Sequence, residues 1–155
     1  MVRIIPGDLD DVRVAAMVLT HQERALAETA RGCGHALDVS GLRRPDIQLW
    51  TIWDGDALAG IGALRSLSRD HGELKSMYIA PAFRGLGYAR AMLDRLSEEA
   101  GRAGHARLSL ETGSWDYFIP ARSLYAAAGF QICGPFGDYQ PDPNSVFMTR
   151  AVDPA

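Results

Sequence analysis

The sequence is poor in cysteine, lacks a large excess of either charge and has no long hydrophobic run. Only Cys33 and Cys133 occur among its 155 residues, which excludes a disulfide framework and a four-cysteine metal site and favours a reducing cytoplasm. The formal net charge is −3, whereas nucleic-acid-binding proteins need a basic surface, so no nucleic-acid partner is expected. No apolar stretch reaches the roughly 18 residues of a membrane-spanning helix, and no secretory signal is visible, so no membrane association is expected.

The rest of the composition favours a single folded domain. Hydrophobic residues make up 47% of the chain and charged residues 23%, a balance typical of proteins that bury a core. The length falls within the ~100–200 residues of one domain, and no repeat, low-complexity tract or linker divides the chain. We therefore expect residues 1–155 to form one domain.

The first third of the chain predicts one strand followed by helices. The strand at 2–5 ends at Pro6, and Asp8 stands where a helix N-cap is expected. A second helix is predicted at 21–30, and residues 35–45 are interpreted as a loop or a short helix. The first helix is predicted to bury an apolar face formed by Val12, Ala15, Ala16 and Leu19.

The remainder predicts a hairpin, a further strand, and then alternating helices and strands. The turn Asp54-Gly55-Asp56 separates two β-rich runs, which indicates a hairpin because Asp-Gly suits tight turns. The later elements are a strand at 73–79, helices at 89–100 and 120–128, and strands at 107–111, 131–133 and 146–149. This order predicts a mixed α/β (α+β) domain built on one central sheet.

The segment from Met77 to Ala89 carries the clearest chemical signal. A predicted strand runs into a turn that contains Gly85 and Gly87, and the turn opens directly onto a helix. The first turn of a helix has backbone N–H groups without partners, so such a turn suits a phosphate or pyrophosphate group. The dinucleotide-binding fingerprint is not met, because its third glycine position holds Arg90. On the glycines alone, a turn without a ligand is the simpler interpretation.

Two motifs in the right order change that interpretation. Arg84-x-x-Gly87-x-Ala89 fits the [R/Q]-x-x-G-x-[G/A] signature of the GNAT acyltransferase superfamily. The block from Ala121 to Phe130 resembles that family's A-x-x-L-Y-x-x-x-G-F pattern. A finer likeness to a bacterial group of N-acetyltransferases runs through His35-Ala36-Leu37, Gly72-Glu73-Leu74-Lys75-Ser76-Met77 and Gly134-Pro135-Phe136. The resemblance covers nearly the whole chain and implies a mostly antiparallel sheet with splayed central strands, flanked by helices.

The resemblance also implies a site for acetyl-CoA as cosubstrate, without a metal. The backbone of residues 77–79 would pair with the pantetheine amides like an added strand. The N–H groups of residues 84–89 would surround the pyrophosphate. The implied cofactor-binding residues are Met77, Tyr78, Ile79, Arg84, Gly85, Leu86, Gly87, Tyr88, Ala89 and Tyr125. One departure concerns Phe118, which stands where many relatives carry an asparagine that binds the cofactor.

Tyr125 is the candidate acid. It occupies the tyrosine of the second motif, so the resemblance implies that its phenol serves the leaving sulfur. The alternative is a tyrosine that only packs on an amphipathic helix.

Two carboxylates are candidates for the base that takes the proton of the amine. Glu73 is the first, because period-two alternation places it on the same strand face as Met77 and Ile79. Glu111, on the next strand, is the second, and the two are able to share the task through a water. Either one is alternatively a salt-bridge partner, for example of Lys75.

His35 and Glu73 are the candidate acceptor-binding residues. His35 lies in the segment that forms the acceptor-side wall in the resembling proteins, and a loop histidine bonded to backbone is the alternative. The expected reaction is transfer of an acetyl group from acetyl-CoA to a primary amine of a small molecule or peptide, by direct attack in a ternary complex. The alternatives are transfer of a longer acyl group and a non-catalytic CoA-binding sensor. A homodimer is left open.

Overall fold

The computed structural model describes residues 1–30 and 35–153, so Cys33 lies outside the described residues. Within this part of the chain, one seven-stranded sheet has the order β1-β2-β3-β4-β5-β7-β6. The strands are β1 (Val2–Pro6), β2 (Ile47–Asp54), β3 (Ala57–Ser68), β4 (His71–Ile79), β5 (Arg107–Gly113), β6 (Gln131–Cys133) and β7 (Ser145–Ala151). The helices are α1 (Val12–Ala27), α2 (Val39–Leu42), α3 (Tyr88–Arg102) and α4 (Ile119–Ala127), with short 3-10 turns at Pro81–Phe83 and Asp116–Phe118.

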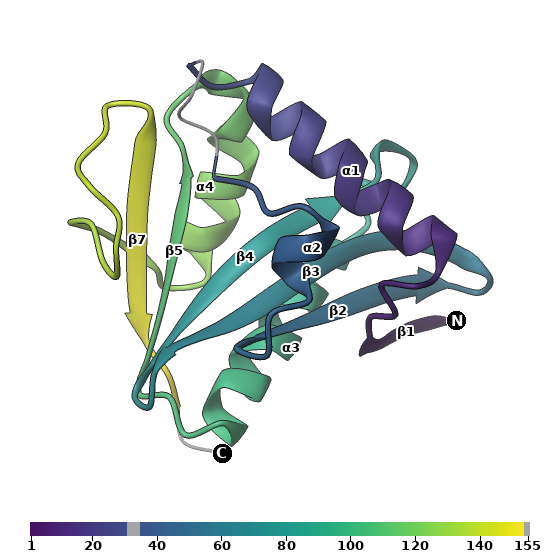
Figure 1. Cartoon of the computed structure of the whole chain (residues 1–155), viewed down its shortest axis with the longest axis horizontal. Coiled ribbons are helices and arrows are strands. Elements are labelled where there is room, and N and C mark those ends of the chain that lie inside the picture. Colours follow the sequence, from purple (N-terminus) through teal and green to yellow (C-terminus); the bar gives the residue numbers. More distant parts are fainter. Residues whose placement is uncertain (31–34, 154–155) are drawn as a thin grey trace.

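Helices cover both faces of the sheet (Figure 1). Helices α1 and α2 pack on one face, where Val14 and Leu42 join Trp53 in a buried cluster. Helices α3 and α4 pack on the other face, where Leu93 joins Trp50. Neighbouring strands run antiparallel except for the parallel pair β4 and β5. The expected fold, a mostly antiparallel mixed sheet flanked by helices, is confirmed. Among the described residues, no helix has the length and apolar character to cross a lipid bilayer.

Helix α1 corrects two predictions about where helices begin and end. It is one continuous helix rather than two, because no glycine or proline lies between Val12 and Ala27 to interrupt it. Its N-cap is Asp11 and not Asp8: the Asp11 side chain accepts the amide of Arg13 at 2.9 Å. Asp8 instead accepts the amide of Asp10, in the turn that precedes the helix.

The buried face of α1 is also different from the predicted one. Val12 is 80% exposed and Leu19 is 53% exposed, whereas Val14 and Val18 are buried against the sheet. Both stripes are apolar in the sequence, so periodicity alone does not choose between them. Contact with the sheet decides in favour of the stripe whose branched side chains fill the space above it.

Strand β4 contains a bulge at its centre. Lys75 pairs with Ala63 but Tyr78 pairs with Ile61, so two residues of β4 stand opposite one residue of β3. Inside the bulge, Ser76 has a φ of 55°, which is unusual for a residue with a side chain. Simple alternation along the strand therefore ends at this point.

The bulge overturns the predicted side-chain faces of β4. Leu74, Met77 and Ile79 all pack in the cluster on the α3 side. Glu73 alternates with Leu74 and shares the opposite, α1-side face with Lys75, because only one residue separates them and the bulge comes later. The prediction that Glu73, Met77 and Ile79 share one face is therefore wrong.

The two central strands separate beyond the bulge. β4 and β5 pair only between residues 71–74 and 107–110, although β4 continues to Ile79 and β5 to Gly113. Figure 1 shows the two strands meeting at one end and diverging toward the other. The edge of β4 at residues 75–79 therefore has no strand partner on the β5 side within the described chain.

Candidate active site

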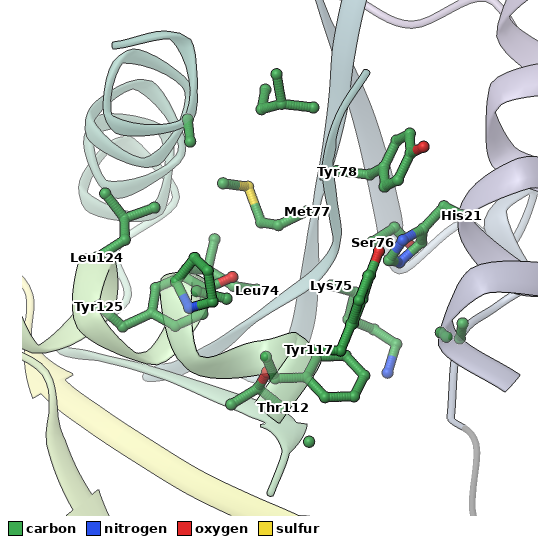
Figure 2. Close-up of a pocket in the computed structure, with 18 of the residues that line it drawn as sticks. His21, Leu74, Lys75, Ser76, Met77, Tyr78, Thr112, Tyr117, Leu124 and Tyr125 are labelled. Atoms are coloured by element: carbon green, nitrogen blue, oxygen red, sulfur yellow. The ribbon is translucent and has the colours of Figure 1, made fainter. Parts of the chain in front are cut away.

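A cavity of about 490 Å³ occupies the place where β4 and β5 diverge. It is bounded by both strands, α1, the start of α3, and α4 (Figure 2). Most of the sequence-predicted site residues line it: His35, Glu73, Met77, Tyr78, Ile79, Arg84, Gly85, Gly87, Tyr88, Ala89, Glu111 and Tyr125. Leu86 is the exception, because its side chain is exposed and lies outside the lining.

The turn before α3 presents a row of backbone amides at one end of the cavity. Gly85 and Gly87 have φ values of 77° and 84°, which only glycine adopts at little cost. The first amide of α3 that reaches a carbonyl is that of Ala91, which bonds to Gly87 at 3.1 Å. The amides of residues 85–90 have no backbone acceptor in the described chain. Together with the helix dipole, they form a site for an anion.

Side chains hold this turn in place. Arg84 donates from Nε to the carbonyl of Ile79 at 2.9 Å, so part of its guanidinium closes the turn. Tyr88 donates its hydroxyl to Asp54 at 2.9 Å and connects the start of α3 to the β2–β3 hairpin. A Cβ added at Gly85 or Gly87 would meet nothing within 4 Å, so the glycines border open space. A bulky ligand is therefore able to approach the backbone here.

Tyr125 reaches the cavity from α4. It is 6% exposed, and burial raises the pKa of its phenol above the ordinary value. Its ring packs edge-on against Phe130, with centroids 5.8 Å apart. In Figure 2, Tyr125 and Leu124 lie on the α4 side of the cavity, across from Met77. Burial alone acts on the pKa of this phenol, without a hydrogen bond from the described residues, so the hydroxyl is available to a ligand.

The Phe118 ring packs against Gly113, just before helix α4, which carries Tyr125. A Cβ placed on Gly113 would overlap the Phe118 ring, so this glycine at the end of β5 is required for the ring to fit. Phe118 lines the cavity and contributes apolar surface there.

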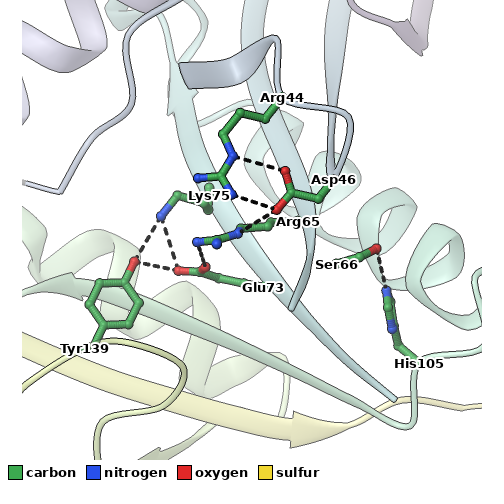
Figure 3. A network of polar contacts seen from close by, with 8 residues as sticks. All are labelled: Arg44, Asp46, Arg65, Ser66, Glu73, Lys75, His105 and Tyr139. Atoms are coloured by element: carbon green, nitrogen blue, oxygen red, sulfur yellow. Dashed lines mark hydrogen bonds and ion pairs between the residues drawn. The ribbon is translucent and has the colours of Figure 1, made fainter. Parts of the chain in front are cut away.

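Glu73 is part of the cavity wall and is held there by an ionic network (Figure 3). Only 1% of its surface is exposed. Its Oε2 accepts hydrogen bonds from the hydroxyl of Tyr139 at 2.6 Å and from Nζ of Lys75 at 3.3 Å. Its Oε1 has no hydrogen-bond partner in the described chain and lies 3.9 Å from Nη1 of Arg65, which also pairs with Asp46. Glu73 is thus anchored by its neighbours.

Glu111 is the more accessible carboxylate. It shares a sheet face with Glu73, because Ser109 stands opposite Glu73 and Glu111 follows two residues later. Burial raises the pKa of Glu111 to about 7, against the lowering effect of a hydrogen bond with Ser145 and of the Lys75 charge. The negative charges of Glu73 and Asp142 raise this pKa further. A half-buried carboxylate therefore titrates near neutral pH inside the cavity.

The α1 side of the cavity carries neutral and aromatic groups. His21 lies beside the ring of Tyr78, and burial lowers its pKa to about 4, so it is neutral at neutral pH. His35 is exposed and its ring meets that of Tyr139 edge-on at 5.3 Å. The structure therefore places His35 at the end of the cavity that also holds Glu73 and Glu111.

Tyr139 is the site residue that sequence reasoning missed. It comes from the irregular connection between β6 and β7, where no periodicity or motif marks one residue above its neighbours. The only signal nearby is the likeness at Gly134-Pro135-Phe136, a few residues earlier. Its place in the cavity follows from the tertiary fold, because β7 returns beside β5.

Within the described residues, no three His, Cys, Asp or Glu side chains are grouped as metal ligands would be.

Comparison of the sequence with known proteins agrees with the geometry of the cavity. A sequence model of the acetyltransferase (GNAT) family matches residues 13–130. The chain is 46% identical to the uncharacterized N-acetyltransferase YsnE of Bacillus subtilis over 145 residues, which cover 94% of this chain and 96% of the relative.

Solved structures with the same fold include acyltransferases. A Klebsiella pneumoniae protein described as an acyl-CoA N-acyltransferase superposes with a TM-score of 0.82 at 29% identity, covering 99% of both chains. A Bacillus subtilis acetyltransferase in complex with CoA superposes with a TM-score of 0.69 at 18% identity, covering 98% of this chain and 99% of the other. The second similarity concerns the fold alone.

Proposed function

Because the chain belongs to the acetyltransferase (GNAT) family, we propose that it transfers an acetyl group from acetyl-CoA to a primary amine by direct attack in a ternary complex. The observation that carries this proposal is a single cavity that joins an amide-lined turn to a pair of carboxylates. Residues 1–155 are proposed to act as one domain, in the cytoplasm. The acceptor is proposed to be the amine of a small molecule or a peptide.

The chain's residues fit the cofactor at the open end of the cavity. The amides of residues 85–90 have no backbone acceptor in the described chain, and they would bind the pyrophosphate oxygens. The unpaired edge of β4 at 75–79 would bond the pantetheine amides as an added strand would. When bound, acetyl-CoA supplies the activated acetyl group. Phe118 and Leu124 would cover its arm with apolar surface and exclude water.

Glu111 and Glu73 are proposed to have different roles at the acceptor end of the cavity. Glu111 takes the proton from the ammonium, because it is the more accessible group and its pKa of about 7 suits a base at neutral pH. Glu73 adds a negative charge that attracts the ammonium and raises the pKa of Glu111. This division reverses the order expected from sequence, in which Glu73 was the first candidate.

Tyr125 is proposed to serve the leaving sulfur. Burial keeps its phenol protonated over the working pH range. Since the ordinary pKa of a thiol is only about 8.5, full proton transfer from this phenol is uphill. Tyr125 therefore acts chiefly by donating a hydrogen bond as negative charge develops on sulfur.

Thermal unfolding with acetyl-CoA tests the cofactor site. At ~100 times its dissociation constant, a ligand stabilises the folded state by roughly 2.7 kcal/mol, which corresponds to a shift of several degrees in Tm. We expect acetyl-CoA and free CoA to shift Tm more than a plain adenine nucleotide does. A shift without free-thiol release across a panel of primary amines would favour a CoA-binding sensor over an enzyme.

Two glycines provide a matched pair of variants for this experiment. Gly87 and Gly104 have φ values of 84° and 86° and no atoms near an added Cβ, so alanine costs similar backbone strain at both. Only Gly87 lines the cavity. Gly87→Ala is expected to lose most of the acetyl-CoA shift and Gly104→Ala to keep it. Equal shifts in both variants would mean that the turn does not bind the cofactor.

A further inference from the structure

Tyr139 joins one end of the ionic network around Glu73, from a distant part of the chain (Figure 3). Its hydroxyl donates to Oε2 of Glu73 at 2.6 Å and accepts from Nζ of Lys75 at 2.9 Å. The same side chain lines the cavity. One hydroxyl group therefore contacts both charged side chains that β4 directs to the α1 side of the sheet.

Packing holds the Tyr139 ring in this position. Its centroid lies 5.1 Å from that of Phe136 and 5.4 Å from that of Phe147, a residue of β7. His35 packs edge-on against the same ring, with the two centroids 5.3 Å apart. A ring held by three neighbours has little freedom, so its hydroxyl stays aimed at Glu73.

Glu73 depends on this hydroxyl. A buried carboxylate keeps its charge only when donors replace the lost water. The Tyr139 hydroxyl is the shorter of the two contacts to Oε2, and Oε1 has no hydrogen-bond partner in the described chain. Without Tyr139, Lys75 alone would donate a hydrogen bond to this carboxylate, and the Glu73 side chain would lose its shortest anchor.

The negative charge of Glu73 raises the pKa of Glu111. The groups that face Glu111 are Glu73 and Lys75 from β4, Asp142 from the β6–β7 connection, and Ser145 from β7. Behind Glu73 stand Arg65 and Asp46, whose charges belong to the same network. Of these groups, Glu73 and Lys75 are hydrogen-bonded to the hydroxyl of Tyr139.

We propose that Tyr139 is a positioning residue: its hydroxyl fixes the Glu73 carboxylate in the cavity wall, and so makes Glu111 the carboxylate that exchanges a proton with the acceptor. This inference rests on the proposed function only in naming the acceptor amine as the source of the proton. The arrangement of Tyr139, Glu73 and Glu111 is testable in the protein alone, without an acceptor.

The test is a pH titration of glutamate carboxyl groups by ¹³C NMR in the unmodified chain, Tyr139→Phe and Tyr117→Phe. In Tyr139→Phe, Glu73 loses its shortest hydrogen bond and is expected to turn toward Arg65 on β3, which moves its negative charge away from Glu111 on β5. The titration midpoint of Glu111 is then expected to fall by about half a pH unit or more. Tyr117 also lines the cavity but no hydrogen bond of its hydroxyl is found in the described chain, so Tyr117→Phe is expected to leave the midpoint unchanged.

Glu73→Gln gives a second and independent measurement, because a neutral side chain of the same shape removes the charge directly. It is expected to lower the Glu111 midpoint, and Tyr139→Phe added to it is expected to lower it no further. Additive shifts in the double variant, or an unchanged midpoint in folded Tyr139→Phe, would overturn the proposal. Titration shifts of the expected kind without acetyl transfer would support the positioning role and count against the transferase function only.

Discussion

Replacing Glu111 with glutamine is expected to lower the rate of acetyl transfer at neutral pH by about 10²- to 10⁴-fold, the usual contribution of a positioned base. The substitution keeps the shape of the side chain but removes its ability to take a proton from the ammonium. The measurement is kcat/KM for an accepted amine. Glu98→Gln, an exposed change on α3, is a suitable control.

The pH dependence of the rate is a more specific test of the base role of Glu111. Glu111 is active only when deprotonated, so the rate should rise with pH through its pKa of about 7 and level off above it. In Glu111→Gln this acidic limb should disappear. A limb that persists unchanged in the variant would assign the base role to another group, with Glu73 as the first alternative.

The Glu111 carboxylate is also expected to destabilise the folded protein at high pH. Its pKa is raised from 4.5 to about 7 in the folded state, so folding favours the protonated form. The stabilisation from this preference is fully present below pH ~4.5 and is lost as pH rises through ~7, on the order of 3 kcal/mol in all. Relative to the unmodified chain, Glu111→Gln should therefore gain stability in denaturant unfolding at pH 8 and gain little at pH 4.

Replacing Tyr125 with phenylalanine is expected to lower kcat by about 10²-fold while leaving the affinity for acetyl-CoA nearly unchanged. The ring contributes apolar surface and packs against Phe130, and the variant retains both. Only the hydroxyl is lost, and it is needed when charge develops on the leaving sulfur. The result would be a fall in turnover without a change in cofactor binding.

Two measurements on Tyr125→Phe separate this role from packing. The acetyl-CoA-induced shift in Tm should match that of the unmodified chain, and the unfolding midpoint without ligand should change little. Turnover equal to that of the unmodified chain would remove Tyr125 from the chemistry. Loss of the cofactor shift would instead show that the hydroxyl helps to bind acetyl-CoA.

Local chemistry in the sequence was sufficient to predict several elements of the molecule. The turn with Gly85 and Gly87 was predicted to present free amides, because the first turn of a helix has N–H groups without partners. The Asp54-Gly55-Asp56 hairpin and the amphipathic helix that became α3 follow from turn chemistry and periodicity. These features depend on residues close together in the chain, so the sequence alone determined them.

Features that depend on distant contacts were decided only by the tertiary structure. The buried stripe of α1 was ambiguous in the sequence, and the sheet selected Val14 and Val18. The bulge at Ser76 moved Glu73 to the opposite face from Met77, because pairing with β3 interrupts the alternation. Tyr139 met Glu73 across 66 positions of sequence. Such contacts arise from the path of the whole chain, which no local pattern encodes.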